Sequence, residues 1–196
     1  QDSYFVIAHF HYVLIGGSIF ALLAGFYYWI PKMTGVLLND KFGRFCFTLI
    51  FAGFNLTFFP MHYLGMEGMP RRTHTYHEGM GFDDPNKLAT IGAFILGFGI
   101  LFSVIQIFYT VINRKKLPQC GNDPWDARTL EWSLPSPVPV YNFARTPIIK
   151  ARDQHWEDKY GSEELKMDYE PDDGHGVHMP DRSWWPLWCG LGILIL

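Results

Sequence analysis

Residues 3–30 read SYFVIAHFHYVLIGGSIFALLAGFYYWI and contain no Asp, Glu, Lys or Arg. The same is true of residues 45–66 and of residues 88–113. A helix crosses the apolar core of a bilayer with about 20 residues, and each of these runs is at least that long. The sequence therefore predicts an all-α membrane protein whose transmembrane helix bundle has three full spans, over about 3–30, 45–66 and 88–113.

Both ends of the chain are apolar. Residues 183–196, SWWPLWCGLGILIL, become more apolar toward the last residue, and we expect them to start a further transmembrane span. The first apolar run begins almost at residue 1 and lacks the positively charged region that opens a signal peptide. We therefore expect the chain to be a piece of a larger membrane protein.

The connections between the spans differ in positive charge. The side reached after the first and third spans carries Lys32, Lys41, Arg44, Arg114, Lys115 and Lys116, and the other side carries Arg71, Arg72 and Lys87. Because cytoplasmic connections are usually the more positive ones, residues 31–44 and the chain after residue 116 are predicted to be cytoplasmic. The chain then divides into a transmembrane part, 1–116, an irregular, extended cytoplasmic segment, 117–182, and the start of a further span, 183–196.

Several classes of site and partner are disfavoured by the composition. The formal net charge is -3 and no basic tract is present, so we expect no nucleic-acid partner. Cys46, Cys120 and Cys189 lack the paired spacing of a thiolate metal site. His175 and His178 lie in a polar, Gly-rich stretch and are interpreted as solvated residues, whereas residues 154–167 are predicted to contain a short amphipathic helix.

Two histidines, His9 and His11, interrupt the first apolar run. Successive residues of a helix turn by about 100°, so these side chains point about 200° apart, with Phe10 between them. They cannot bind one metal ion from a regular helix, but each could serve a separate centre, since imidazole is a common iron ligand in heme proteins. The alternative is that each histidine forms a hydrogen bond with a neighbouring helix.

Residues near the two histidines offer further candidate contacts. Two helical turns toward the outer surface, Asp2 stands above His9 and Tyr4 stands above His11. Arg71 and Arg72 follow the second span on the predicted outer side, where arginine is less common. Guanidinium groups bind carboxylates through paired hydrogen bonds, and heme propionates are carboxylates. The alternative is a solvated pair of loop arginines.

Three stretches together carry a family resemblance: DSYFVIAHFHYVLIGG at 2–17, NLTFFPMHYLGMEGMPRR at 55–72 and DPWDARTLEW at 123–132. They closely resemble the C-terminal part of subunit I of heme-copper terminal oxidases, most like the cytochrome c oxidases in an extended bacterial form. The resemblance covers residues 2–145 and continues more weakly to the end of the chain. It implies two hemes, expected to be of the A type, and a copper ion whose ligands lie outside this chain.

The resemblance also implies roles for individual residues. His9 matches the axial ligand of the high-spin heme, where dioxygen binds opposite copper, and His11 matches an axial ligand of the low-spin heme. Phe10 matches the residue between the hemes. Arg71 and Arg72 match the pair that holds the heme propionates, and Tyr4 is a candidate contact of the cofactors.

A magnesium ligand is also implied, at Asp2. The family commonly has a second magnesium ligand, a histidine, immediately before this aspartate, and this chain has Gln1 instead. The departure makes magnesium the weakest of the expected cofactors.

The function implied by the resemblance is reduction of dioxygen to water, coupled to proton pumping, in a multi-pass complex of a bacterial plasma membrane. The expected partners are the N-terminal part of subunit I, subunit II with a copper centre, subunit III and cytochrome c. Quinol-oxidising relatives often have Asn after the second histidine and lack the outer acidic residue, so Tyr12 and Asp2 favour cytochrome c as electron donor.

Two other function classes remain open at this stage. A di-heme electron carrier would need four histidine ligands and would not bind carbon monoxide. A transporter or channel without heme could use the histidines to relay protons, because ionisable groups at membrane depth often mark an ion path.

Overall fold

The computed structural model describes residues 2–169, 177–181 and 183–195. Gln1 and His175, which the sequence analysis singled out, lie outside the described residues.

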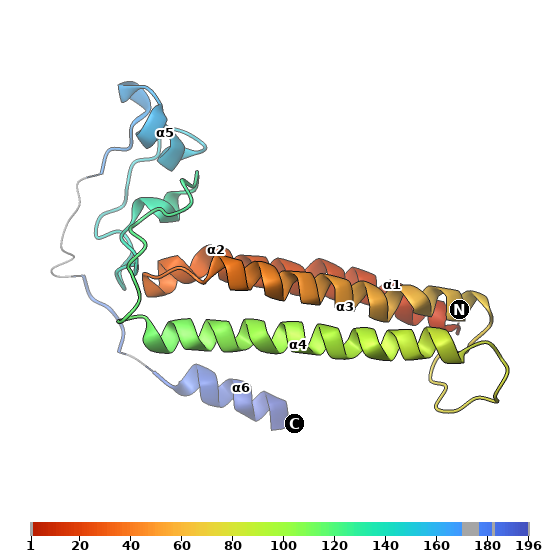
Figure 1. Ribbon diagram of the computed structural model, residues 1–196. Helices are drawn as coiled ribbons and strands as arrows, with labels where there is room; N and C mark the ends of the chain where they lie inside the picture. Colours follow the sequence, from red (N-terminus) through yellow and green to blue (C-terminus); the bar gives the residue numbers. More distant parts are fainter. Residues whose placement is uncertain (1, 170–176, 182, 196) are drawn as a thin grey trace.

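Three long helices lie side by side and form the body of the molecule (Figure 1). The first runs unbroken over Tyr4–Thr34 and comprises α1 (Tyr4–Leu14), the π-helical turn η1 (Ile15–Ile19) and α2 (Phe20–Thr34). The others are α3 (Asp40–Met66) and α4 (Asp83–Asn113).

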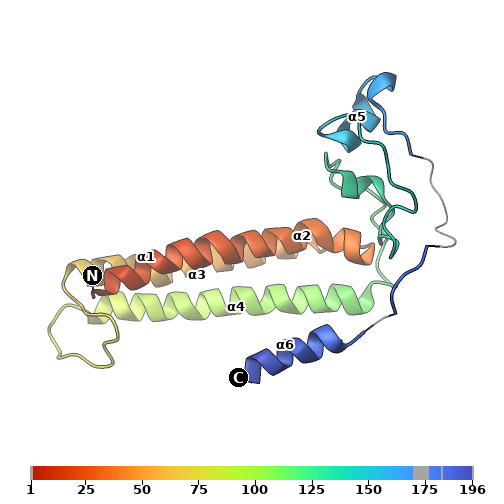
Figure 2. The ribbon, with the colours of Figure 1, turned by 180° about the vertical axis from the view of Figure 1, so that it is seen from behind.

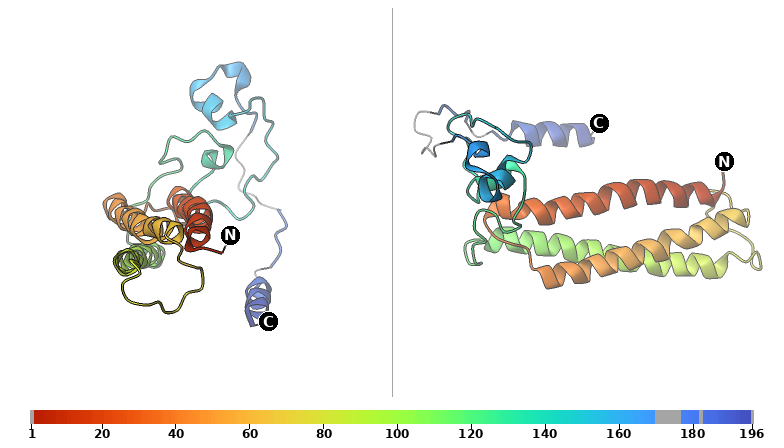
Figure 3. Two further views of the ribbon diagram at one scale, coloured as in Figure 1. Left: turned by 90° about the vertical axis from the view of Figure 1, so that its right-hand side faces the viewer. Right: turned by 90° about the horizontal axis from the view of Figure 1, so that it is seen from above.

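All three helices are long and apolar enough to cross a membrane, and the described part of the chain contains no β-strand. The end-on view shows the three helices clustered around one another (Figure 3). The predicted all-α transmembrane bundle is confirmed, and each helix extends about one turn beyond its uncharged run at one end.

The turn between α2 and α3 is defined by local hydrogen bonds. Gly35 follows α2 with φ 81°, a left-handed conformation that glycine adopts without strain, and its N–H donates to the Pro31 carbonyl at 2.7 Å. Asn39 caps α3, because its side-chain oxygen accepts a hydrogen bond from the Phe42 N–H at 2.9 Å. The chain thus reverses within a few residues, and α3 returns alongside α2 (Figure 2).

Glycines bring α3 and α4 into backbone contact. A Cβ added to Gly53 would overlap the backbone of Leu96, and one added to Gly92 would lie 2.5 Å from the Thr57 nitrogen. Gly97, on another face of α4, has no atom within 4 Å of the position that its Cβ would take. In lipid, where tails are as apolar as side chains, such close backbone contact is a main source of helix association.

The first helix contacts α3 on both sides of η1. A Cβ on Gly65 would overlap the backbone of Phe5, so α1 and α3 are also in close contact. Beyond η1, the Phe20 ring meets the Phe54 ring edge-on at 5.6 Å, and the Tyr27 ring fills the space beside Gly43. A π-helical turn holds one extra residue, which shifts the following residues by about 100° and keeps Phe20 and Tyr27 on the side facing α3.

Residues 117–169 form a loop-rich lobe at the end of the bundle where α2 and α4 end (Figure 1). The lobe contains η2 (Leu130–Ser133), α5 (Gln154–Tyr160) and η3 (Glu163–Leu165). The short helix predicted within 154–167 corresponds to α5 and η3.

The lobe is attached to α2 through Lys32. The Lys32 ammonium is buried, donates hydrogen bonds to the carbonyls of Leu134 at 2.6 Å and Asn122 at 3.0 Å, and lies 4.9 Å from the centre of the Trp132 ring. Trp132 itself is fully buried. The segment that we predicted to be extended therefore packs against the helix that carries the two histidines.

A partly buried carboxylate connects the two halves of the lobe. Asp123 accepts hydrogen bonds from the Ala127 N–H at 2.9 Å, from the Lys159 ammonium at 2.8 Å and from the His155 ring at 3.0 Å. Burial alone would raise the pKa of Asp123, but these hydrogen bonds together hold that pKa below the usual value of aspartate. The ionised carboxylate therefore fastens α5 to the segment that contains Trp132.

The last described helix, α6 (Trp185–Ile195), begins near the lobe, and its first turns expose Trp184, Trp185 and Trp188 (Figure 1). Tryptophans of this kind are common where a helix enters the bilayer. With 11 residues, α6 is shorter than a full span, and the start of a further span at 183–196 stays a prediction.

Replacing Gly92 by alanine is expected to destabilise the protein by about 1–3 kcal/mol, because the new methyl group would overlap the α3 backbone. Gly97→Ala is the matched control and should be neutral or mildly stabilising, since its methyl group meets no atom. Thermal unfolding in detergent, followed by circular dichroism, compares the two variants. Equal midpoints would contradict the close packing of α3 and α4.

The lobe is expected to open in acid. Because the folded-state pKa of Asp123 is lowered, its stabilising contribution is present at neutral pH and is lost as the pH falls through that lowered pKa. Asp123→Asn should remove this stabilisation of the lobe already at pH 7. The loss is measured as faster hydrogen–deuterium exchange of the Ala127 amide. Glu163→Gln, which changes an exposed carboxylate, is the control. Similar Ala127 protection in both variants would show that Asp123 does not fasten the lobe.

Candidate functional site

The face of α1 that packs on α3 determines on which sides of α1 the two histidines lie. Phe5 lies 4.9 Å from the His62 ring, Ala8 is fully buried, and the Tyr12 hydroxyl donates to the Asn55 side-chain oxygen at 2.9 Å. Phe5, Ala8 and Tyr12 therefore form the stripe that faces α3. With 3.6 residues per turn, His9 falls on one flank of this stripe and His11 on the other.

The His11 ring is held in a defined orientation. Its Nδ1 lies 2.7 Å from the Ile7 carbonyl oxygen, and because a carbonyl can only accept, Nδ1 carries the proton. In the neutral ring, Nε2 then has a free electron pair and can bind a metal. The rings of Phe10 and Phe58 each lie 4.3 Å from the imidazole, centre to centre. A second-shell carbonyl of this kind is typical of a ligating histidine.

His9 lies on an exposed flank of α1 and has no hydrogen bond or ion pair with any residue that the structure describes. Phe10, between the two histidines, is 37% exposed. The two imidazoles thus lie on separate flanks of α1: His9 is exposed, whereas His11 is half-buried with Phe58 of α3 against one face of its ring. This arrangement fits two hemes, one on each side of the helix.

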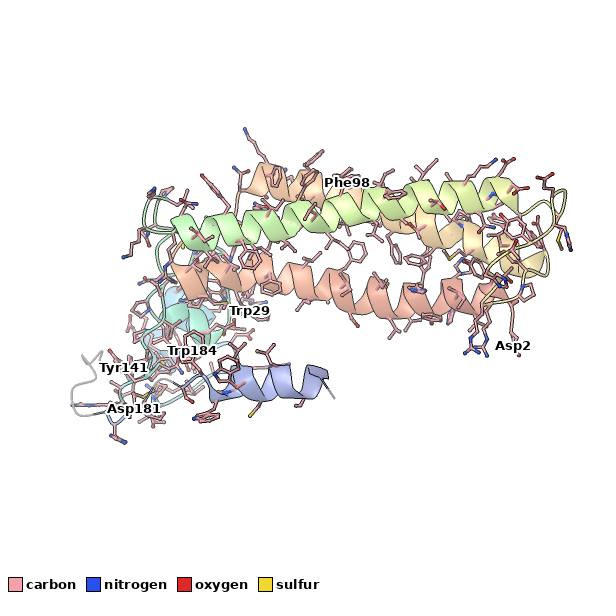
Figure 4. The ribbon with its side chains drawn as sticks, turned by 90° about the horizontal axis from the view of Figure 1, so that it is seen from below. Asp2, Trp29, Phe98, Tyr141, Asp181 and Trp184 are labelled. Carbon is pink, nitrogen blue, oxygen red and sulfur yellow. The ribbon has the colours of Figure 1, made fainter. Side chains whose placement is uncertain are left out.

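The outer end of the bundle joins α1 to the loop of residues 67–82. The Tyr4 N–H donates to the Met69 carbonyl, and the Arg71 N–H donates to the Asp2 carbonyl, both at 2.8 Å. The Asp2 carboxylate and the Arg71 guanidinium also form an ion pair at 2.5 Å. Figure 4 shows Asp2 at this end, beside the loop. Asp2 and Arg71, which the sequence analysis assigned to different cofactors, therefore contact each other directly.

Arg72 differs from Arg71 in its surroundings. It is exposed, has φ 65° and makes no ion pair within the described ranges. A non-glycine residue at positive φ is uncommon. The role of the two arginines toward propionates stays a prediction.

Tyr4 lies in a small apolar cluster of the outer end. It packs, together with Tyr76, against the buried side chains of Leu64, Met69 and Phe82. This cluster fixes the start of α1 against the end of α3 and the start of α4. The cofactor contact proposed for Tyr4 stays a prediction.

The residues present do not form a magnesium or copper site. Within the described ranges, no group of three or more His, Cys, Asp or Glu side chains could hold a metal ion. Asp2 is engaged by Arg71, and Gln1 lies outside the described residues. The described residues therefore offer no complete magnesium or copper site, and copper ligands would have to come from elsewhere.

The sequence analysis missed three residues of α3 near the histidines. Asn55 binds Tyr12, Phe58 stacks on His11, and His62 lies 5.3 Å from the Tyr12 ring with a buried Nδ1 that has no partner among the described residues. The sequence could have identified His62, because it is a third histidine within an apolar run. Nothing in the sequence distinguished Phe58 from the other phenylalanines of α3.

The chain is similar in sequence to known oxidase subunits. A family model described as "Cytochrome C and Quinol oxidase polypeptide I" matches residues 1–95. The chain is 46% identical to cytochrome c oxidase subunit 1 of Bacillus sp. (strain PS3), over 100% of the chain and 31% of the relative. The corresponding protein of Bacillus subtilis (strain 168) is 42% identical, again over 100% of the chain and 31% of the relative.

Quinol oxidases are also among the relatives. Quinol oxidase subunit 1 of Bacillus subtilis (strain 168) is 40% identical over 97% of the chain and 29% of the relative. The chain spans about a third of the length of the curated relatives that it matches. With three helices long and apolar enough to span a membrane and with matches along its whole length, the chain is similar to a part of subunit I of cytochrome c and quinol oxidases.

Proposed function

We propose that this chain is part of the catalytic subunit of a proton-pumping cytochrome c oxidase that reduces dioxygen to water. In this proposal His11 would hold the iron of a low-spin heme, and His9 would hold the iron of a high-spin heme that supplies dioxygen binding. The observation that carries the proposal is the His11 ring, whose Nδ1 is bound to the Ile7 carbonyl and whose Nε2 remains available.

The protein's own contribution is positioning and electrostatics. When bound, the hemes would supply electron transfer and dioxygen chemistry. α1 holds two imidazoles on opposite flanks, so that a single rigid helix would fix the distance between the two centres. Phe10 would fill the space between them, and the guanidinium groups of Arg71 and Arg72 would face the propionates.

We favour cytochrome c over quinol as the electron donor. Relatives named cytochrome c oxidase reach 46% identity, whereas those named quinol oxidase reach 40%. Asp2 and Tyr12 are also the residue types expected of the cytochrome c branch. Oxidation of reduced cytochrome c and of quinol by the purified complex discriminates between the two donors, and turnover with quinol alone would assign the chain to the quinol oxidases.

The proposed setting is a bacterial plasma membrane, with the 67–82 loop outside and the 117–169 lobe in the cytoplasm. Positive charge around residues 31–44 and 114–116 supports this orientation. The proposed partners are the remainder of subunit I with the copper ligands, subunit II with a copper centre, and subunit III.

In the full-length subunit, His11→Ala should abolish the low-spin heme signal, and His9→Ala should abolish the spectral shift on adding carbon monoxide, because each change removes an axial ligand. Reduced-minus-oxidised and carbon monoxide difference spectra measure the two effects. His74→Ala, in the exposed loop, is the control. If a histidine variant keeps the corresponding spectral signal, the ligand role proposed for that histidine is wrong. Two hemes without any carbon monoxide response would indicate a di-heme electron carrier.

Arg71→Gln and Arg72→Gln should each lower a heme midpoint potential while leaving the heme content unchanged, because a nearby positive charge favours the reduced heme. Charges about 8 Å apart at an effective dielectric constant of about 20 interact by about 2 kcal/mol, which bounds the effect of each variant. Redox titration measures the potentials. Lys87→Gln, at the exposed start of α4, is the control, and potentials equal to those of the control would remove the propionate role.

A further inference from the structure

The imidazole of His11 is stacked on a phenylalanine of a different helix. The Phe58 ring, from α3, lies 4.3 Å from the His11 ring, centre to centre, and the two planes differ by only 13°. Phe58 is 7% exposed, so its ring is enclosed by the protein and not by the surroundings of the bundle.

Phe58 is in turn supported by a row of contacts between α1 and α3. The Phe54 ring lies 5.3 Å from Phe58 and 4.7 Å from Tyr12, and Phe54 is only 4% exposed. The Tyr12 hydroxyl donates to Asn55 at 2.9 Å, next to Phe54 in α3. The position of the Phe58 ring is therefore set by the register of α3 against α1, at the level of His11.

Two constraints then act on the same imidazole in different ways. The hydrogen bond from Nδ1 to the Ile7 carbonyl, at 2.7 Å, fixes which nitrogen is protonated and the direction of one ring edge. A face contact with Phe58 fixes the plane of the ring. Because a metal binds Nε2 in the ring plane, a phenyl group stacked on the face does not compete with it. Together with the Phe10 ring, which also lies 4.3 Å from the imidazole, these two contacts determine the orientation of the His11 ring.

We propose that Phe58 is a positioning residue, which holds the plane of the His11 imidazole and thereby sets the electronic properties of the heme that His11 binds. The inference rests on the proposed role of His11 as a heme ligand. Second-shell contacts orient metal ligands and tune the metal, and the plane of an axial imidazole determines how it overlaps with the iron d orbitals. Phe58 touches the ligand and not the iron, so its effect is indirect.

The test uses the complete oxidase complex with Phe58→Leu, which keeps an apolar side chain and removes the flat ring. We expect the largest g value of the low-spin ferric heme, measured by electron paramagnetic resonance, to shift by more than its line width. The heme content, from the pyridine hemochrome spectrum, should be unchanged. Phe58→Tyr, which keeps a ring in the same place, should restore the parental g value.

Phe59→Leu is the matched control, since Phe59 is the next residue of α3, is 53% exposed and contacts His62 and Tyr63 instead of His11. Parental g values in Phe58→Leu would overturn the inference. If Phe58→Leu loses the heme, the inference is supported when both Phe58→Tyr and Phe59→Leu retain the heme. Loss of the heme from Phe59→Leu as well would overturn the inference. A low-spin signal that survives His11→Ala would instead overturn the proposed function.

Discussion

The close contact of α3 with both other spans is the interaction on which the rest of the structure depends. Gly53 and Gly92 bring α3 against α4, and Gly65 brings it against α1. In a bilayer the gain from burying apolar surface between helices is small, so helices associate where their backbones approach closely. The register that these glycines impose decides which α3 side chain meets His11, and the stacking of Phe58 on the His11 ring follows from it.

Several polar side chains in the spans form hydrogen bonds inside the chain, as the lack of water in a bilayer favours. Thr57 and Ser103 donate to carbonyls one turn earlier in their own helices, and Tyr27 donates to Gln106 across the bundle. His9 stands apart, exposed on its flank of α1 and without a hydrogen bond to the described residues. An ionisable group without a partner at membrane depth is costly, and this contrast is what points to a ligand outside the chain.

The amino-acid sequence predicts the spans well, because charge-free runs of this length have few alternatives. It also predicts the opposite flanks of His9 and His11, since helical periodicity alone determines them. It does not predict the ion pair between Asp2 and Arg71, because that contact depends on how the 67–82 loop folds back. Phe58 could not be identified either: which of the many α3 phenylalanines meets His11 depends on the register between two helices.

The π-helical turn at Ile15–Ile19 has a consequence for how family members can be aligned. A turn of this kind accommodates one residue more than an α-helical turn. Loss of one residue within the turn would leave the histidine half of the helix unaltered and rotate everything from Phe20 to Lys32. Length changes in this helix are therefore tolerated only where Phe20, Tyr27 and the lobe attached to Lys32 can adjust together.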